Sequence, residues 1–177
     1  MRKLSMLFAV VIVASLAVAQ APPAPPKPGP EHKKMEYFLG KWTGDVDSKA
    51  SDFGPAGKGK ATETCAWLPG GFFLSCNRTE NGPMGEVKGT GIMGFDANEK
   101  VYTYYGVDST GGVFLSKGTV NGNVWTWTTS MKMGPKTYKL RFVATVAPPN
   151  SQSFKFEAAE GNGPMKLISE GKSTRAK

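Results

Sequence analysis

Residues 62–76 read TETCAWLPGGFFLSC. This stretch decides the fold because it predicts a β-hairpin with one cysteine on each strand, and the cysteines indicate how the strands pair. It holds both cysteines of the chain, Cys65 and Cys76, on either side of Pro69-Gly70-Gly71. Glycine pairs of this kind form the centre of tight turns between antiparallel strands. With Gly70-Gly71 at the centre, Cys65 falls directly opposite Cys76. The stretch therefore predicts two paired strands joined by a disulfide.

The N-terminal segment predicts export. A short basic start, Met1-Arg2-Lys3, precedes a nearly continuous apolar run from Leu4 to Val18, and Ala17-Val18-Ala19 supplies the small residues that signal peptidase reads. We therefore expect a cleaved signal peptide over residues 1–19 and a periplasmic or secreted protein with no membrane span in the mature chain. A membrane anchor is less favoured, because the run is shorter than the roughly 20 residues that cross a bilayer. In an oxidising compartment two cysteines usually pair, here as a structural staple rather than a redox motif.

The charge balance is basic but dispersed. The chain has 22 Lys and Arg against 14 Asp and Glu, a formal net charge of +8. Such an excess attracts nucleic acid when it is clustered. Here the lysines are scattered, with no run longer than Lys33-Lys34, so we predict a solvated surface and no nucleic-acid partner. The sequence carries no signal for the oligomeric state.

The rest of the chain divides into two parts. Residues 20–30, QAPPAPPKPGP, predict an extended proline-rich tether, and residues 31–177 predict one domain. Glu31–Leu39 predicts a single short helix that Gly40 ends.

Beyond this helix the sequence predicts only strands. Short stretches rich in Thr, Tyr, Val, Phe and Trp alternate with turn signals that force each strand antiparallel to the last. An open sheet of this kind would leave two bare edges, and closure into a barrel removes both. The predicted fold class is therefore all-β: a single up-and-down antiparallel β-barrel of about ten strands with one short N-terminal helix. The expected strands are 41–49, 60–68, 72–80, 86–95, 100–107, 112–120, 123–130, 136–146, 152–159 and 165–174.

The alternation of apolar and polar residues indicates which side of each strand faces inward. It places Phe142 inward in the expected strand 136–146, and Gly89 and Gly91 inward in the expected strand 86–95. Two interpretations of these glycines remain open. They allow a bend in a strongly curved strand, or they leave space for a ligand.

A candidate ligand site follows from the same alternation. Glu63 is expected to face inward opposite Arg78. Either the two form a salt bridge at the rim of the barrel, or Arg78 is internal, held by Glu63, and binds the carboxylate of a ligand. The remaining candidate ligand-binding residues share an inward, apolar or aromatic character: Trp67, Leu74, Met93, Phe95, Tyr102, Tyr104, Phe142 and Phe156.

The chain resembles the secreted bacterial domain-of-unknown-function family 1579 from about Pro28 to Lys172. The segments that carry the resemblance are PGPEHKKMEYFLGKWTGD, ETCAWLPGGFFLSC, GPMGEVKGTGIMGFD, EKVYTYYGVDSTG and GTVNGNVWTW. The resemblance implies a calycin-like β-barrel and no established activity. Gly40-Lys41-Trp42 also resembles the Gly-x-Trp entry of lipocalins, in which a late basic residue packs on the tryptophan and closes one end of the barrel. Lys172 or Arg175 is expected to take that role here.

The sequence favours binding over catalysis but leaves open whether the protein is an enzyme. Nitrobindin, a relative among such barrels, holds haem through a late histidine, whereas this chain has only His32, which we expect to be solvated in the helix. We therefore predict no haem, no other cofactor and no metal site, and no catalytic residue is assigned because no hydrolase motif or metal-ligand spacing is present. The predicted function is binding of a small hydrophobic or amphipathic ligand in the barrel. The alternative is a cell-envelope interaction or structural module without a ligand.

Overall fold

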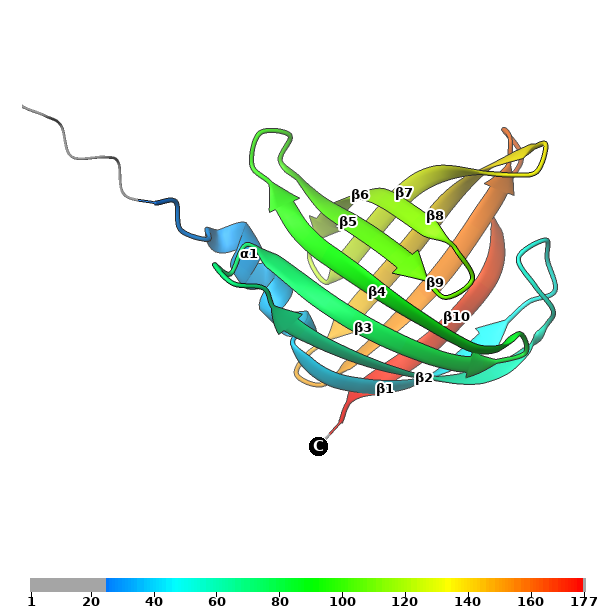
Figure 1. The fold of residues 1–177 in the computed structure, drawn as a ribbon, viewed down its shortest axis with the longest axis horizontal. Helices are drawn as coiled ribbons and strands as arrows, with labels where there is room; N and C mark the ends of the chain where they lie inside the picture. Colours follow the sequence, from blue (N-terminus) through cyan, green and yellow to red (C-terminus); the bar gives the residue numbers. More distant parts are fainter. Residues whose placement is uncertain (1–24, 177) are drawn as a thin grey trace, which may run out of the picture.

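Ten strands close into an antiparallel barrel with a short helix at one end (Figure 1). The computed structural model describes residues 25–176, so the predicted signal peptide and the first part of the predicted tether lie outside the described residues. Each strand pairs with its sequence neighbours, and the first closes on the last. The predicted fold class is confirmed, and every predicted strand is found. The strands are β1 (Gly40–Ser48), β2 (Gly57–Trp67), β3 (Phe73–Gly82), β4 (Gly85–Asp96), β5 (Val101–Asp108), β6 (Val113–Asn121), β7 (Val124–Met133), β8 (Lys136–Ala147), β9 (Ser151–Glu160) and β10 (Lys166–Arg175).

The helix closes one end of the barrel. The α-helix α1 (Pro30–Met35) begins with proline, whose missing N–H costs nothing at this position, and continues as a 3₁₀ turn, η1 (Glu36–Phe38). The predicted single helix is therefore two short pieces, and the helix takes in Pro30 from the predicted tether. Met35 and Phe38 are buried against the core of the barrel. In residues 25–176 no helix combines the length and the apolar character that crossing a membrane requires.

Trp42 and Arg175 lock this closed end. Trp42 is 1% exposed, and its Nε1–H donates a hydrogen bond to the Phe38 carbonyl at 2.9 Å. The Arg175 guanidinium lies 4.5 Å from the centre of the Trp42 ring and donates hydrogen bonds to the Leu39 carbonyl and, at 2.8 Å, to the Tyr37 carbonyl. Of the two basic residues expected for this role, the structure assigns it to Arg175.

Gly40 is required at the start of β1 for a backbone reason. It has a φ of +92°, a conformation that residues with a Cβ rarely adopt. The Arg175 guanidinium also lies 3.3 Å from the position that a Cβ would take. The Gly-x-Trp entry and Arg175 therefore form one closing unit.

The β2–β3 hairpin has the predicted register. Cys65 lies opposite Cys76, and their sulfur atoms are at bonding distance. Gly70 and Gly71 both have positive φ, and the Gly71 N–H donates to the Leu68 carbonyl. The turn chemistry therefore sets the pairing of the two strands.

Within residues 25–176, loops and no helix cover the opposite end of the barrel. Residues 49–56, between β1 and β2, fold across it. Phe53 packs against Tyr138 and Phe156, with ring centroids 5.1 and 5.9 Å apart, and Asp52 accepts hydrogen bonds from Tyr138 and, at 2.8 Å, from Lys136. We call this end the mouth.

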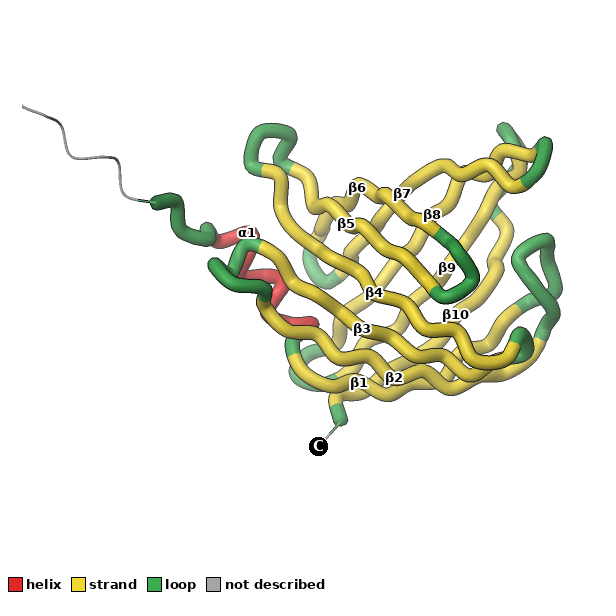
Figure 2. The backbone as a smooth tube through the Cα atoms, in the orientation of Figure 1, coloured by secondary structure: helices red, strands yellow, loops and turns green. Residues whose placement is uncertain are grey.

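The wall of the barrel is incomplete between β6 and β7. These strands pair only from Lys117–Asn121 to Val124–Thr128. Toward the mouth, residues 113–116 pair with β5 alone and residues 129–133 pair with β8 alone, among the residues described. Figure 2 shows the two strands diverging in this region, which we call the β6–β7 seam.

Candidate functional site

The interior of the barrel divides into a filled half and an accessible half. Near α1, packed side chains fill the barrel, and Leu74 is 0% exposed within them. A position without accessible surface cannot touch a ligand unless the core rearranges. This closed half contains Met35, Phe38, Cys65, Leu74, Met93, Tyr102, Trp125, Trp127, Ala144 and Val146, with Phe95 packed against it.

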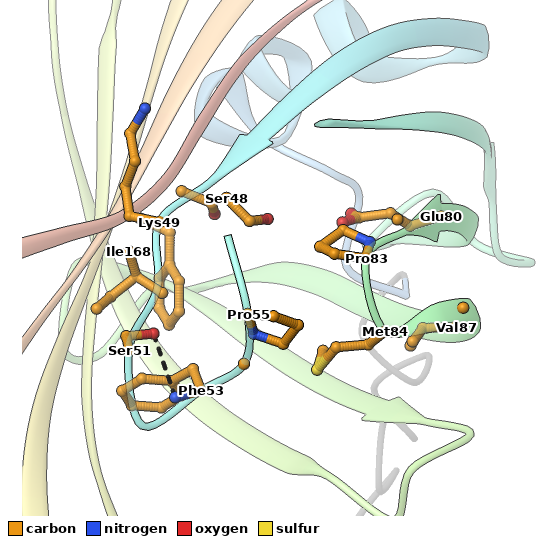
Figure 3. A pocket seen from close by; sticks show the side chains of 15 residues that line it. Ser48, Lys49, Ser51, Phe53, Pro55, Glu80, Pro83, Met84, Val87 and Ile168 are labelled. Atoms are coloured by element: carbon orange, nitrogen blue, oxygen red, sulfur yellow. Dashed lines mark hydrogen bonds between the residues drawn. The ribbon is translucent and has the colours of Figure 1, made fainter. Parts of the chain in front are cut away.

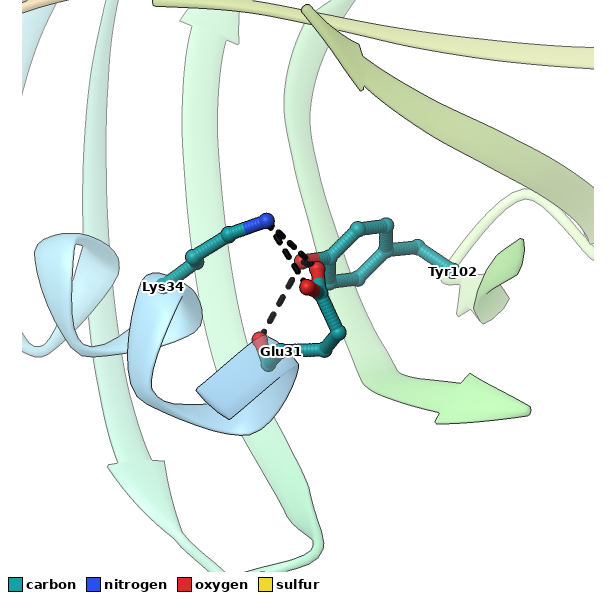
Figure 4. A network of polar contacts seen from close by, with 3 residues as sticks. All are labelled: Glu31, Lys34 and Tyr102. Atoms are coloured by element: carbon teal, nitrogen blue, oxygen red, sulfur yellow. Dashed lines mark hydrogen bonds and ion pairs between the residues drawn. The ribbon is translucent and has the colours of Figure 1, made fainter. Parts of the chain in front are cut away.

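Polar contacts to α1 hold the closed half together (Figure 4). The Tyr102 hydroxyl donates to the Glu31 carboxylate at 2.7 Å, and Lys34 donates to the same carboxylate at 2.7 and 2.9 Å. The Lys34 and Tyr102 hydrogen bonds lower the pKa of Glu31. Burial, and then the hydrogen bond to Glu31, raise the pKa of Tyr102. Tyr102 therefore anchors the helix and does not face an open space.

His32 belongs to this end too, and the expectation that it is solvated is wrong. It is 9% exposed, and its ring meets Phe72 and Phe95 edge-on, with centroids 5.2 and 6.0 Å apart. Its Nδ1 accepts a hydrogen bond from the Gly29 N–H at 3.1 Å. The β2–β3 loop brings Phe72 to the helix, a contact that the pattern within the helix does not contain.

Toward the mouth, the inward side chains remain accessible. Phe142 points into the barrel, since it packs against Trp127 and stacks on Phe154, yet it is 37% exposed. Its neighbours on the interior wall are each partly accessible as well. We call this region the open half; it contains Glu63, Arg78, Glu80, Tyr104, Phe142, Phe154 and Phe156.

A pocket of about 160 Å³ lies at the mouth, between loop 49–56 and the β3–β4 hairpin (Figure 3). Phe53 and Ile168 lie on one side of it and Met84 on the other. Phe156 and Glu80 connect it to the open half. We call it the mouth pocket.

The charged pair inside the barrel differs from the predicted one. Glu63 lies opposite Arg78 in the β2–β3 register, as expected. However, the Arg78 Nη2 donates to the Glu80 carboxylate at 2.6 Å, and the guanidinium lies 5.9 Å from the centre of the Phe154 ring. The expectation that Glu63 holds Arg78 is therefore wrong. Glu80, two residues along the same inward face, was missed; its inward phase in the sequence is the signal that could have identified it.

Glu63 is left without a partner. Among residues 25–176 the structure gives its carboxylate no hydrogen bond and no ion pair. It is surrounded by protein atoms, and burial raises its pKa while the nearby charge of Arg78 opposes the rise. Burial, and then the charge of Glu63, raise the pKa of Tyr104 to about 12. Glu63, Arg78 and Tyr104 therefore share one electrostatic environment inside the barrel.

The neighbouring cysteines do not turn Glu63 into a metal site. One carboxylate oxygen of Glu63 and the sulfurs of Cys65 and Cys76 lie within 4.8 Å of one another. The two sulfurs are joined to each other and so offer no thiolate ligands.

The inward glycines of β4 do not simply leave free space. The ring of Tyr104 lies over Gly91 and Gly106, so closely that a Cβ at either position would overlap it. The space at Gly91 is therefore occupied by an aromatic ring. At Gly89, a Cβ would lie 3.2 Å from the Val107 carbonyl, which indicates a close approach of β4 and β5.

The predicted pocket residues therefore do not form one site but lie in different parts of the barrel. Leu74, Met93, Phe95 and Tyr102 belong to the closed half, and Trp67 lines an open hollow of about 540 Å³ beside α1. The open half brings together Glu63, Arg78, Tyr104, Phe142 and Phe156, and Phe154 and Glu80 complete its wall.

The comparisons with known proteins agree with this architecture. A family model described as "Protein of unknown function (DUF1579)" matches residues 27–175. The chain is similar to Rv2717c from M. tuberculosis, with a TM-score of 0.62 and 14% identity over 84% of this chain and 99% of that one. It is also similar to the S-type phycobiliprotein lyase CPES from Guillardia theta, with a TM-score of 0.55 and 10% identity over 83% and 93%. No curated protein matches the chain. At these identities the likeness is one of fold.

Proposed function

Because the chain belongs to the DUF1579 family of proteins of unknown function, its role must be argued from its own site, and we propose that it binds a small hydrophobic or amphipathic ligand in the open half. The observation that carries the proposal is Phe142. A large apolar side chain that faces the inside of a barrel is normally buried by its neighbours, whereas Phe142 keeps 37% of its surface accessible. An apolar wall that water can reach favours a ligand that covers it.

The dimensions of the site support a small ligand. The mouth pocket has about 160 Å³, similar to an apolar cavity of about 150 Å³ that binds benzene. A longer molecule would extend from the mouth pocket to Phe142. Loop 49–56 is held partly by the exposed Asp52–Lys136 pair, and exposed pairs of this kind contribute only about 0–1 kcal/mol, so displacing that contact costs little.

The proposal involves binding alone, without a catalytic step, a haem or a metal. It also places the protein outside the cytoplasm. A Cys65–Cys76 disulfide fits an oxidising compartment, and the predicted signal peptide would deliver the chain there.

An apolar fluorescent probe is expected to bind saturably to the wild-type protein, and Phe142→Ala is expected to weaken that binding. Losing part of the burial of a phenylalanine ring costs about 1–2 kcal/mol, or about 5- to 30-fold in Kd. A fluorescence titration of both proteins measures this change. Phe73→Ala is the matched control, because Phe73 is an exposed phenylalanine on the outer surface of β3. Equal losses in both variants would contradict binding in the open half.

One observation favours the second candidate, an interaction module. Tyr105 and Val107 on β5 pair with Leu115 and Val113 on β6, and all four side chains lie exposed on the outer wall, Leu115 by 67%. A cluster of exposed apolar residues is typical of a protein contact. Absence of probe uptake, together with a specific complex that Leu115→Lys disrupts, would favour this role over the carrier.

A further inference from the structure

We propose that the open half selects ligands with a cationic head, such as an amine or a guanidine, and that Glu63 binds that head. This inference rests on the proposed function, because it names the class of ligand that the same site takes. Its starting point is the unpartnered Glu63 carboxylate. Glu63 is only half-buried, yet its carboxylate is surrounded largely by protein atoms, and a charge in such a place is costly unless it is paired. A cation that enters beside Glu63 supplies the missing partner.

Arg78 is not free to bind an anionic ligand. Arg78 donates to Glu80 at 2.6 Å and rests against Phe154. A ligand carboxylate at this point would have to displace Glu80, and it would also face Glu63 across the same space. An ammonium group meets two carboxylates instead.

Charges of both signs lie at the mouth, and Lys136 among them is neutralised by two carboxylates. Lys136 is paired with both Asp52, at 2.8 Å, and Glu160, at 3.2 Å. Asp108 adds a further carboxylate at the mouth end of β5. Within the open half as defined above, Glu63 and Glu80 outnumber Arg78, and Arg78 is already paired with Glu80. The full chain carries a formal net charge of +8, so this local excess of carboxylates runs against the charge of the chain as a whole.

The aromatic wall suits a cation as well. Phe142 and Phe154 are stacked, with centroids 5.5 Å apart and planes 13° from parallel, and Tyr104 lies close enough to Glu63 to feel its charge. The faces of aromatic rings attract ammonium and guanidinium groups, more strongly where water is excluded. Arg78 already uses the face of Phe154 in this way at 5.9 Å.

Glu63 must be ionised to bind a cation, which makes the binding dependent on pH. Burial raises its pKa, and of the groups facing it Arg78 opposes the rise, with Tyr104 and Glu80 nearby. An alkylammonium group stays charged from pH 5 to 8, as lysine does. Affinity for an amine is therefore expected to increase with pH through the pKa of Glu63 and to level off above it.

The test is displacement of the bound fluorescent probe by three compounds of equal chain length: octylamine, octanol and octanoate. Octylamine is expected to bind most tightly to the wild-type protein at pH 7. The net positive charge of the chain alone would favour octanoate instead. Glu63→Gln is expected to weaken octylamine by about 10- to 150-fold, the range of a charge-assisted hydrogen bond, and to leave octanol nearly unchanged. Glu170→Gln is the matched control, because it removes the same charge from the outer side of β10.

Each outcome separates the two proposals. Tightest binding by octanoate, or equal effects of Glu63→Gln and Glu170→Gln, would overturn the cation site and leave the carrier intact. Failure of the probe itself to bind would remove the carrier. If Glu63→Gln does not fold, the pH series on the wild-type protein decides: a flat octylamine affinity from pH 5 to 8 contradicts a role for Glu63.

Discussion

Trp42→Ala is expected to lower the free energy of unfolding by about 3–5 kcal/mol, the range for removing a buried tryptophan. Trp42 is 1% exposed at the junction of β1 and η1. Its loss leaves a cavity under the helix, deprives the Phe38 carbonyl of its donor, and removes the ring on which Arg175 lies. Chemical denaturation monitored by circular dichroism measures the change.

Trp42→Phe is the control for this prediction, because it keeps a ring and removes the indole N–H. A smaller loss of about 1–3 kcal/mol is expected, for the carbonyl left without a partner. A loss below 1 kcal/mol for Trp42→Ala would show that the closed end contributes little to stability. The same outcome would show that the Gly-x-Trp entry is not needed to stabilise the barrel.

Loss of the Cys65–Cys76 bridge is expected to lower the free energy of unfolding by about 3 kcal/mol, as the chain-entropy model gives for a short loop. The hairpin register places the two residues opposite each other without the bridge, so the double variant Cys65→Ala/Cys76→Ala is expected to keep the fold. Denaturation of the wild-type protein with and without reductant, and of the double variant, measures the contribution.

Intact mass after alkylation is the control for this second prediction. No thiol is expected to react before reduction, and two are expected to react after it. Two reactive thiols in the mature, unreduced protein would contradict the bridge and would also remove an argument for an oxidising compartment.

The fold could be predicted because its information is local. Strands are recognised by side chains that alternate with a period of two and by the turn residues that separate them. Gly70-Gly71 and the flanking cysteines are enough to predict the register of one hairpin without the rest of the chain. Closure of the barrel then follows from the instability of open edges. The role of Arg175 followed from the resemblance and needed the structure only to decide against Lys172.

The site was less predictable than the fold. The alternation of apolar and polar residues shows whether a side chain faces the inside of the barrel, but not how far along the barrel axis it lies. Leu74 and Phe142 are both inward and apolar, yet Leu74 is fully buried in the cluster that includes Met35 of α1, whereas Phe142 stays 37% exposed within residues 25–176. The docking of α1 is a long-range contact, and it also explains why His32 is buried. Arg78 pairs with Glu80 on its own strand and not with Glu63 on the opposite strand. Side-chain rotamers determine which pair forms, and no sequence pattern encodes them.

The β6–β7 seam has a consequence for motion. Backbone amides that point across the seam from residues 113–116 and 129–133 have no ladder partner, so they are expected to exchange with deuterium well before those of the fully paired β8. Rapid exchange confined to these two segments would identify the seam as the least cooperative part of the barrel, and slow exchange there would contradict it. Parting β6 from β7 at the seam breaks few hydrogen bonds, so the ligand proposed above has a second route out of the barrel besides the one under loop 49–56.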